Sequence, residues 1–196
     1  VDSDSFEALY IPESNRPQQF CSFCEDDSGI WFGSLGKIYR YTFEDDSLKL
    51  FLDITEHGSF LFSNICDLDS ETLLCTSDNG SILVDKNTSE TYDSPFGTTE
   101  EVSSSMIDSQ GRIWLALYNK GIYVYDKDGN LLERYTKDSS ALNCDIILSM
   151  TERDSMIWAG TDGGGINIID CENDSIEVIT NIPGDQFSFP TVSIKS

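Results

Sequence analysis

Two closely spaced cysteines are the first candidates for chemistry in the chain, in the segment Cys21-Ser-Phe-Cys24. This spacing could form a redox pair or half of a zinc site if the backbone turned there or began a helix. Residues 20–25 look extended instead, and residues three apart on a strand point to opposite faces. The other four cysteines are widely scattered and form no dense framework. The sequence therefore favours free, packed thiols, and we predict no metal site.

An acidic segment, Asp126-Lys-Asp-Gly-Asn130, is similar to the start of a calcium-binding loop. Such a loop needs glycine at its sixth position and a bidentate glutamate at its twelfth. Leu131 and Lys137 occupy those positions here. A turn that joins two strands is therefore the better interpretation of this segment.

Paired carboxylates are the remaining candidates for catalysis, for example Asp26-Asp27 and Asp45-Asp46. Two acids can hydrolyse a glycosidic bond, but adjacent acids on turns are usually solvated and keep ordinary pKa values. His57 is the only histidine, which argues against a His-based triad and a His-rich metal site. We predict no catalytic residue and no cofactor.

Charge and hydropathy exclude several classes of partner. The net charge is −23, with 12 Lys and Arg against 35 Asp and Glu, and this would repel nucleic acid and anionic membranes. The longest apolar run, residues 113–118, is far shorter than the roughly 20 residues that span a bilayer. The polar, acidic start of the chain, Val1-Asp-Ser-Asp-Ser5, is unlike a signal peptide.

The elements that must position these residues are short strands. Runs rich in Ile, Leu, Val, Tyr, Phe and Trp recur between clusters of Asp, Ser, Asn and Gly, which is typical of an all-β protein. Residues 113–126 align without a gap with residues 157–170, and Trp-to-Gly and Gly-to-Asp spacings of seven and five are the same in both. Residues 72–85 keep these spacings with Leu73 in the place of Trp, and residues 30–41 have a shorter turn.

These anchors lie at positions 31, 73, 114 and 158, so they are separated by 42, 41 and 44 residues. In the third unit, extended runs at 102–107, 112–117, 122–125 and 131–135 alternate with turns. Four antiparallel strands in about 42 residues match one blade of a β-propeller. We predict blades at about 20–54, 60–95, 100–136 and 143–182, with partial strands of further blades at 1–15 and 187–196.

One pattern joins these features, Asp-x-x-Gly-x-Ile-Trp-x-Gly-Thr-x-x-Gly-Gly-Ile. It is present as Asp108-Ser-Gln-Gly-Arg-Ile-Trp114 and as Ile157-Trp-Ala-Gly-Thr-Asp-Gly-Gly-Gly-Ile166. The pattern resembles the two-component regulator propeller repeat over about residues 20–180. That family forms the periplasmic sensor of bacterial hybrid two-component systems, especially those that control polysaccharide use in gut Bacteroides-type bacteria.

The resemblance implies an incomplete propeller, because family propellers contain more blades than four. It also implies that the membrane helix, the histidine kinase and the DNA-binding module belong to other parts of a parent protein. Four blades should form an open arc, or two chains should dock through the exposed faces of their terminal blades. Closure into a four-bladed ring is the alternative.

A ligand face can be predicted from the direction of the strands. Turns between second and third strands share one face of a propeller with the connections between blades. Aromatic rings beside amides and carboxylates suit an oligosaccharide, although each such residue could be an ordinary turn residue. We predict a ligand set of Arg16, Asn79, Tyr118, Asn119 and Asp162, with His57, Phe96 and Asn143 on nearby connections.

Three functions remain open. The first is an extracytoplasmic sensor segment that responds to an oligosaccharide or another small ligand and signals to a kinase. The second is a propeller scaffold for protein interaction or receptor dimerisation. The third, a propeller lyase or glycosidase, is the least supported, because His and Arg are scarce.

Overall fold

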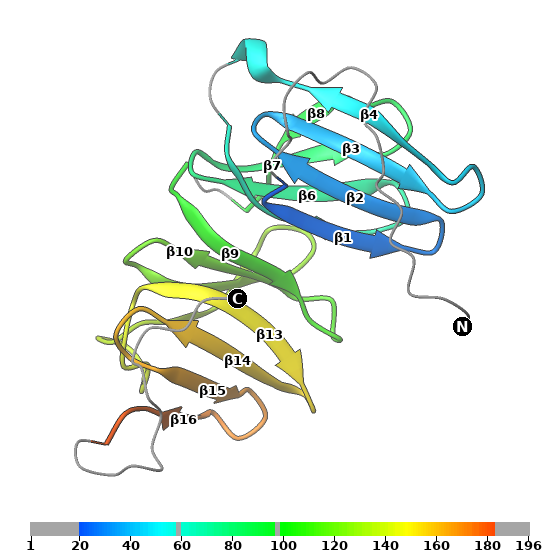
Figure 1. The fold of residues 1–196 in the computed structure, drawn as a ribbon. Coiled ribbons are helices and arrows are strands. Elements are labelled where there is room, and N and C mark those ends of the chain that lie inside the picture. The colour runs from blue at the N-terminus through cyan, green and yellow to red at the C-terminus, as the bar shows by residue number, and fades with distance from the viewer. Residues whose placement is uncertain (1–19, 58–59, 97–98, 183–196) are drawn as a thin grey trace.

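The computed structural model describes residues 20–57, 60–96 and 99–182. Within these ranges the chain forms sixteen β-strands and a short 3-10 helix, Thr55–His57. The strands form four antiparallel sheets of four strands, each built from consecutive strands (Figure 1). The predicted all-β architecture of four-stranded repeats is therefore confirmed. No helix in the described ranges is long and apolar enough to cross a bilayer.

The bounds of the strands follow the chain order. The first sheet contains β1 (Ser22–Asp26), β2 (Gly29–Ser34), β3 (Lys37–Thr42) and β4 (Ser47–Asp53). The second contains β5 (Phe62–Asp67), β6 (Thr72–Ser77), β7 (Gly80–Asp85) and β8 (Thr91–Asp93). The third contains β9 (Val102–Ile107), β10 (Ile113–Leu117), β11 (Gly121–Tyr125) and β12 (Leu131–Tyr135). The fourth contains β13 (Ile147–Arg153), β14 (Met156–Thr161), β15 (Ile166–Asp170) and β16 (Ser175–Ile179).

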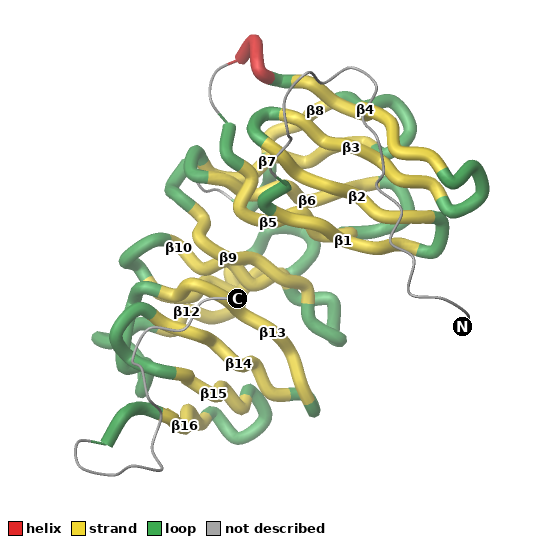
Figure 2. Tube along the Cα trace, in the orientation of Figure 1, coloured by secondary structure: helices red, strands yellow, loops and turns green. Residues whose placement is uncertain are grey.

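The four sheets follow one another along an arc. The first strands of the sheets, β1, β5, β9 and β13, lie side by side along its inner edge (Figure 2). The first and fourth sheets stand at opposite ends, and the described residues do not close into a ring. The arrangement is that of consecutive blades of an incomplete propeller. The partial strands predicted at 1–15 and 187–196 lie outside the described residues.

A buried apolar cluster joins each sheet to the next. In sequence order, the clusters centre on Trp31 and Phe62, on Leu74 and Leu115, and on Trp114 and Ile157. Alternate residues of each second strand face opposite neighbours, as the period of a strand requires. Burial of one such large side chain contributes about 1.5–3 kcal/mol, so these junctions hold the sheets in their order.

The structure corrects one anchor of the repeat. The alignment places Leu73 at the tryptophan position, but Leu73 faces backwards and packs with Trp31 in the first junction. Leu74 faces the third sheet, as Trp114 faces the fourth. The cause is the turn after each second strand. Only two residues separate β6 from β7, whereas three separate β10 from β11, so an alignment on the glycine after the turn shifts the strand by one residue.

An aspartate in the turn before the second strand pairs with the tryptophan of that strand in two of the sheets. In the third sheet the indole Nε1 of Trp114 donates a hydrogen bond of 2.8 Å to Oδ2 of Asp108. In the first sheet Nε1 of Trp31 donates a bond of the same length to Oδ2 of Asp26. An indole N–H buried in a junction would otherwise lack a partner. The aspartate of the first turn therefore permits the tryptophan to be buried between sheets.

Candidate functional site

The structure describes four of the five residues in the predicted ligand set. Asn79 lies in the β6–β7 turn, Tyr118 and Asn119 lie in the β10–β11 turn, and Asp162 follows β14. All four are exposed and occupy the same end of their sheets, with Tyr118 50% exposed. Asn119 has φ 56°, so its residue type also suits the left-handed backbone of the turn. Arg16 lies outside the described residues, and a ligand at this face stays a prediction.

Two residues predicted on nearby connections have structural roles. Phe96 is fully buried in the junction between the second and third sheets, with its ring centroid 5.7 Å from that of Tyr125. Its placement on a ligand face is therefore wrong, because a connection can insert a large apolar side chain between sheets. Asn143 donates from Nδ2 to the carbonyl oxygen of Gly164 at 2.8 Å and accepts from Asn167 at 2.9 Å. Asn143 therefore holds the β14–β15 hairpin in place.

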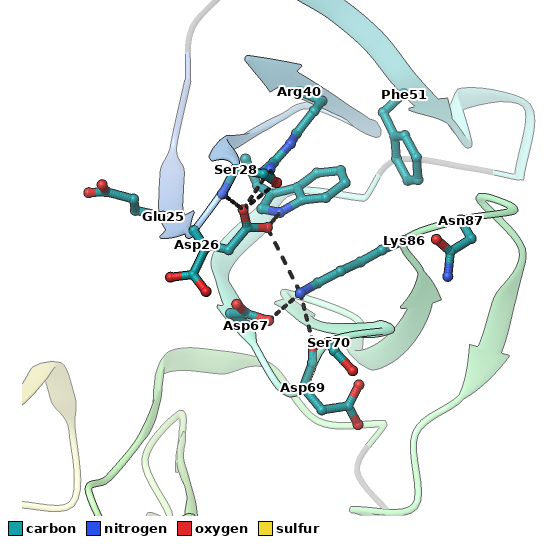
Figure 3. Close-up of a pocket in the computed structure, with 12 residues that line it drawn as sticks. Glu25, Asp26, Ser28, Arg40, Phe51, Asp67, Asp69, Ser70, Lys86 and Asn87 are labelled. Carbon is teal, nitrogen blue, oxygen red and sulfur yellow. Dashed lines mark hydrogen bonds and ion pairs between the residues drawn. The ribbon is translucent and has the colours of Figure 1, made fainter. Parts of the chain in front are cut away.

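A groove of about 770 Å³ opens between the first and second sheets (Figure 3). It lies at the end formed by the β1–β2, β5–β6 and β7–β8 turns, which is opposite to the predicted ligand face. Five of its lining residues carry carboxylates: Glu25, Asp26, Asp27, Asp67 and Asp69. Two carry positive charges, Arg40 and Lys86, and Phe51 adds an aromatic ring.

Asp26 is the centre of the first-sheet wall. Its Oδ1 accepts a bond of 2.6 Å from Nη2 of Arg40 and bonds of 2.9 Å from the backbone N–H and the hydroxyl of Ser28. Burial would raise the pKa of the Asp26 carboxyl, but the Arg40 guanidinium and the other hydrogen bonds outweigh burial and hold its pKa well below the ordinary value. Asp26 is therefore an ionised anchor. The expectation that this carboxylate is solvated is wrong, since its side chain is only 14% exposed.

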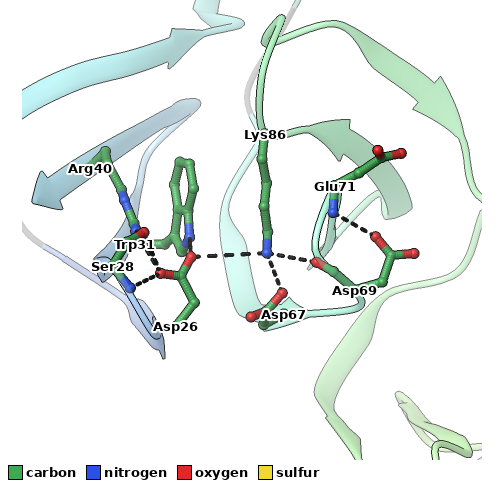
Figure 4. Close-up of polar contacts among 8 residues, drawn as sticks. All are labelled: Asp26, Ser28, Trp31, Arg40, Asp67, Asp69, Glu71 and Lys86. Carbon is green, nitrogen blue, oxygen red and sulfur yellow. Dashed lines mark hydrogen bonds and ion pairs between the residues drawn. The ribbon is translucent and has the colours of Figure 1, made fainter.

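Lys86 connects the two walls of the groove (Figure 4). Its ammonium group bonds Asp67, donates to the carbonyl oxygen of Asp69 at 2.7 Å, and lies 3.9 Å from Oδ2 of Asp26. The Lys86 side chain is only 9% exposed. A buried cation shared by carboxylates of two sheets holds those sheets at a defined separation.

Two polar groups at the rim of the groove can meet a ligand. Asp27 and Asn87 are exposed at the rim, on turns of different sheets. Trp31 is less accessible, because Arg40 lies 4.3 Å from its ring centroid and Phe51 packs edge-on at 4.8 Å. The groove therefore offers hydrogen bonds in preference to a flat stacking surface.

The other groups with candidate chemistry have structural surroundings. All six cysteines lie in the described ranges, and no disulfide joins them. Burial, followed by nearby negative groups, raises the pKa of the Cys24 thiol to about 12, so it is a poor nucleophile. Among the described residues, no three or more His, Cys, Asp or Glu side chains are grouped to hold a metal ion.

The acidic turn after β11 is closed by its own side chains. Asp126 accepts hydrogen bonds from the backbone N–H of Asp128 at 2.9 Å and of Asn130 at 2.8 Å. Nδ2 of Asn130 donates to the second carboxylate oxygen of Asp126 at 2.8 Å. These bonds show a strand-joining turn, as the sequence predicts.

Sequence reasoning missed Arg40, Asp67 and Lys86. The one available signal was that an aspartate precedes Trp31 by five residues, much as Asp108 precedes Trp114 by six, which marks Asp26 as a partner of the indole. Lys86 carries no such signal, because its partner Asp26 belongs to another sheet. Contacts of this kind depend on how the sheets pack.

We expect Lys86→Met to lower the free energy of unfolding by about 2 kcal/mol, because it keeps the apolar stem and leaves Asp26 and Asp67 without their shared cation. Urea unfolding followed by far-UV circular dichroism measures this change. The matched control is Lys49→Met, whose side chain is 66% exposed in its pair with Asp45, and we expect it to change stability little. Equal effects of the two substitutions would contradict the role of Lys86 as a link between sheets.

Comparisons with known proteins agree with this fold. No family model matches the chain, and no curated protein matches its sequence. The extracellular domain assigned to a hybrid two-component system of B. thetaiotaomicron is 19% identical, with a TM-score of 0.73 over 93% of this chain and 24% of that chain. A second such domain from the same organism is 16% identical, with a TM-score of 0.68 over 88% of this chain and 26% of that chain.

Virginiamycin B lyase from Staphylococcus aureus is also similar, at 16% identity and a TM-score of 0.62, over 87% of this chain and 58% of that chain. Likeness at such identities shows the fold alone. The present chain spans about a quarter of the length of the two sensor domains.

Proposed function

We propose that the chain is an extracytoplasmic ligand-sensing segment of a hybrid two-component sensor kinase. In this proposal the segment lies in the periplasm and responds to an oligosaccharide. A histidine kinase elsewhere in the parent protein then passes the signal to transcription of glycan-use genes. The repeat pattern around Trp114 and Trp158 and the likeness to extracellular domains of such sensors both support this function.

The observation that carries the ligand proposal is the groove between the first and second sheets. Its volume of about 770 Å³ falls in the range of roughly 300–1,000 Å³ typical of small-molecule sites. Sugar hydroxyls both donate and accept hydrogen bonds, so they can pair with the carboxylate of Asp27 and the amide of Asn87. Phe51 supplies limited apolar contact.

The charge of the groove narrows the kind of sugar. Its lining carries five carboxylates against two cations, and the whole chain has a net charge of −23. This field repels anions, attracts amine-bearing cations and does not oppose the binding of neutral molecules. We therefore expect neutral or amino sugars to bind more tightly than uronate or sulfated oligosaccharides of equal length.

Isothermal titration calorimetry with a panel of neutral, amino and uronate trisaccharides tests this proposal. We expect a member of the first two groups to bind and Asp27→Asn/Asn87→Ala to weaken its binding at least ~10-fold, as the loss of one charge-assisted and one neutral hydrogen bond implies. The control, Asp128→Asn, changes an exposed carboxylate of the third sheet and should leave affinity unchanged. Binding only of acidic sugars, or equal effects of the two variants, would contradict the groove as the site.

A catalytic function has less support. Because its pKa is lowered, Asp26 stays ionised and has no proton to give as a general acid. The lyase is also less similar in structure to the chain than the sensor domains are.

A further inference from the structure

A pair of exposed leucines joins the first and second sheets at the end of the sheets opposite to the groove. Leu35 lies in the β2–β3 turn, and Leu61 immediately precedes β5. The two residues form an antiparallel bridge, beside which Gly36 donates its backbone N–H to the carbonyl oxygen of Phe60 at 2.8 Å. Side chains of directly opposed residues share one side, with Cβ atoms about 4.5–5.5 Å apart. The leucines are 54% and 45% exposed, so they present one apolar surface.

The positions of these leucines recur in the later sheets. One position directly follows each second strand, and the other directly precedes a first strand. First strands of successive sheets lie side by side, so these positions form a row at one end of the inner strands (Figure 2). We call the row the inner strip, and its residues are Leu35, Leu61, Asp78, Glu101, Tyr118 and Asp162.

Hydrogen bonds hold neighbouring members of the inner strip together. The backbone N–H of Leu61 donates to Oδ1 of Asp78 at 3.2 Å, so a carboxylate lies beside the leucine pair. In the third sheet the backbone N–H of Tyr118 donates to the carbonyl oxygen of Glu101 at 2.9 Å. Apolar and acidic residues are therefore next to each other in both sheets.

The charge of the inner strip is negative and unpaired. Its three carboxylates are exposed, and no Lys or Arg of the described residues forms an ion pair with them. Two lysines at the same end of the sheets are already paired, Lys37 with Asp53 at 2.9 Å and Lys120 with Glu100 at 2.5 Å. A partner must therefore bring its own cations to neutralise the strip.

Turn chemistry does not explain the apolar members of the inner strip. Turns favour Gly, Pro, Asn, Asp and Ser, and Asp78 and Asp162 follow this rule at the position after the second strand. Leu35 and Tyr118 hold the same position, yet they leave apolar surface in water, with Tyr118 50% exposed. Exposed apolar groups rimmed by polar residues mark interaction sites on soluble proteins.

We propose that the inner strip binds a segment of a partner protein in which apolar side chains alternate with Lys or Arg. The leucine pair and Tyr118 contact the apolar side chains, and Asp78 and Asp162 pair with the cations. Charge complementarity selects this occupant, because a chain of net charge −23 attracts a basic segment and repels an acidic one, including a second copy of itself. The proposal is independent of the ligand of the groove, which lies at the other end of the sheets.

Selection from a displayed library of random peptides tests this chemistry without a known partner. The native chain is the bait, and Leu35→Ser/Leu61→Ser is the counter-bait, because it keeps every charge and removes the leucine pair. We expect the peptides that prefer the native chain to combine apolar residues with Lys or Arg. Their affinity, measured by fluorescence anisotropy, should fall at least ~10-fold on the counter-bait and should weaken as salt is raised.

Two further variants separate the inner strip from general attraction to an acidic chain. Leu131→Ser/Leu132→Ser is the matched control, since these leucines are 52% and 50% exposed on β12, the last strand of the third sheet, and it should leave affinity unchanged. Asp78→Asn/Asp162→Asn should weaken binding and reduce its dependence on salt. Far-UV circular dichroism and urea unfolding establish that each variant is folded.

Three results would overturn the proposal. The first is a selection that enriches acidic peptides, or none that distinguishes the native chain from the counter-bait. The second is an equal loss of affinity on the control and on the counter-bait, which would show attraction to the chain as a whole. The third is unchanged affinity of the selected peptides for Asp78→Asn/Asp162→Asn.

Discussion

Trp114→Ala is expected to lower the free energy of unfolding by about 4 kcal/mol, whereas Trp158→Ala should cost about 1–2 kcal/mol. Both tryptophans hold the same position of the repeat. Trp114 is 0% exposed and stacks on Tyr135 with ring centroids 5.8 Å apart, so its removal leaves a cavity in the junction between the third and fourth sheets. Trp158 is half-buried on the last sheet of the arc.

Urea unfolding followed by far-UV circular dichroism measures both changes without relying on tryptophan fluorescence. Equal costs for the two substitutions would contradict the different burial of these two positions.

Asp108→Asn is expected to cost on the order of 3 kcal/mol, because it removes a buried charge that accepts two charge-assisted bonds. Oδ2 of Asp108 accepts from Nε1 of Trp114 at 2.8 Å and from Nε of Arg112 at 2.6 Å, and the side chain of Asp108 is 0% exposed. An asparagine keeps the shape but loses the charge that both donors face. The exposed Asp128→Asn is the matched control and should cost little.

The cost of Asp108→Asn should also depend on pH. Burial would raise the pKa of the Asp108 carboxyl, but the bonds from Trp114 and Arg112 outweigh burial and lower it below the ordinary 3.8. A carboxyl with a lowered pKa in the folded state contributes its stability above its unfolded pKa and loses it as pH falls through the folded value. The difference in stability between the native chain and Asp108→Asn should therefore be full near neutral pH and shrink below about pH 4. A difference that stays constant down to pH 2 would contradict the ionic role of Asp108.

The repeat made the fold predictable, because local pattern decides the strands and the turns. The Trp-to-Gly and Gly-to-Asp spacings of seven and five residues recur in residues 113–126 and 157–170, so repeated sheets could be inferred without contacts. The register of the second strands was harder to predict. The β6–β7 turn is one residue shorter than the β10–β11 turn, so the residue at the tryptophan position is Leu74 and not Leu73. Phe96 shows the same limit, because a connection with no periodic pattern gives no sign of burial.

The candidate site could not be derived in the same way. Asp26 and Lys86 meet only because the first and second sheets pack at a certain angle, and no spacing in the chain encodes that contact. Sequence reasoning therefore favoured the turns at the other end of the sheets, where Asn79, Tyr118 and Asp162 are visible as exposed polar residues. The groove depends on side chains whose neighbours belong to another sheet.

Mapping a bound sugar on the isotopically labelled chain shows whether it binds in the groove or at the predicted ligand face at the other end of the sheets. Backbone amide chemical shifts would be recorded by nuclear magnetic resonance during titration with the tightest trisaccharide of the panel. The account predicts that shifts gather at Ser28, Asp67, Ser70 and Asn87, around the groove. Shifts that gather instead at Asn79, Tyr118, Asn119 and Asp162, or no shifts with any sugar, would contradict a groove that binds an oligosaccharide.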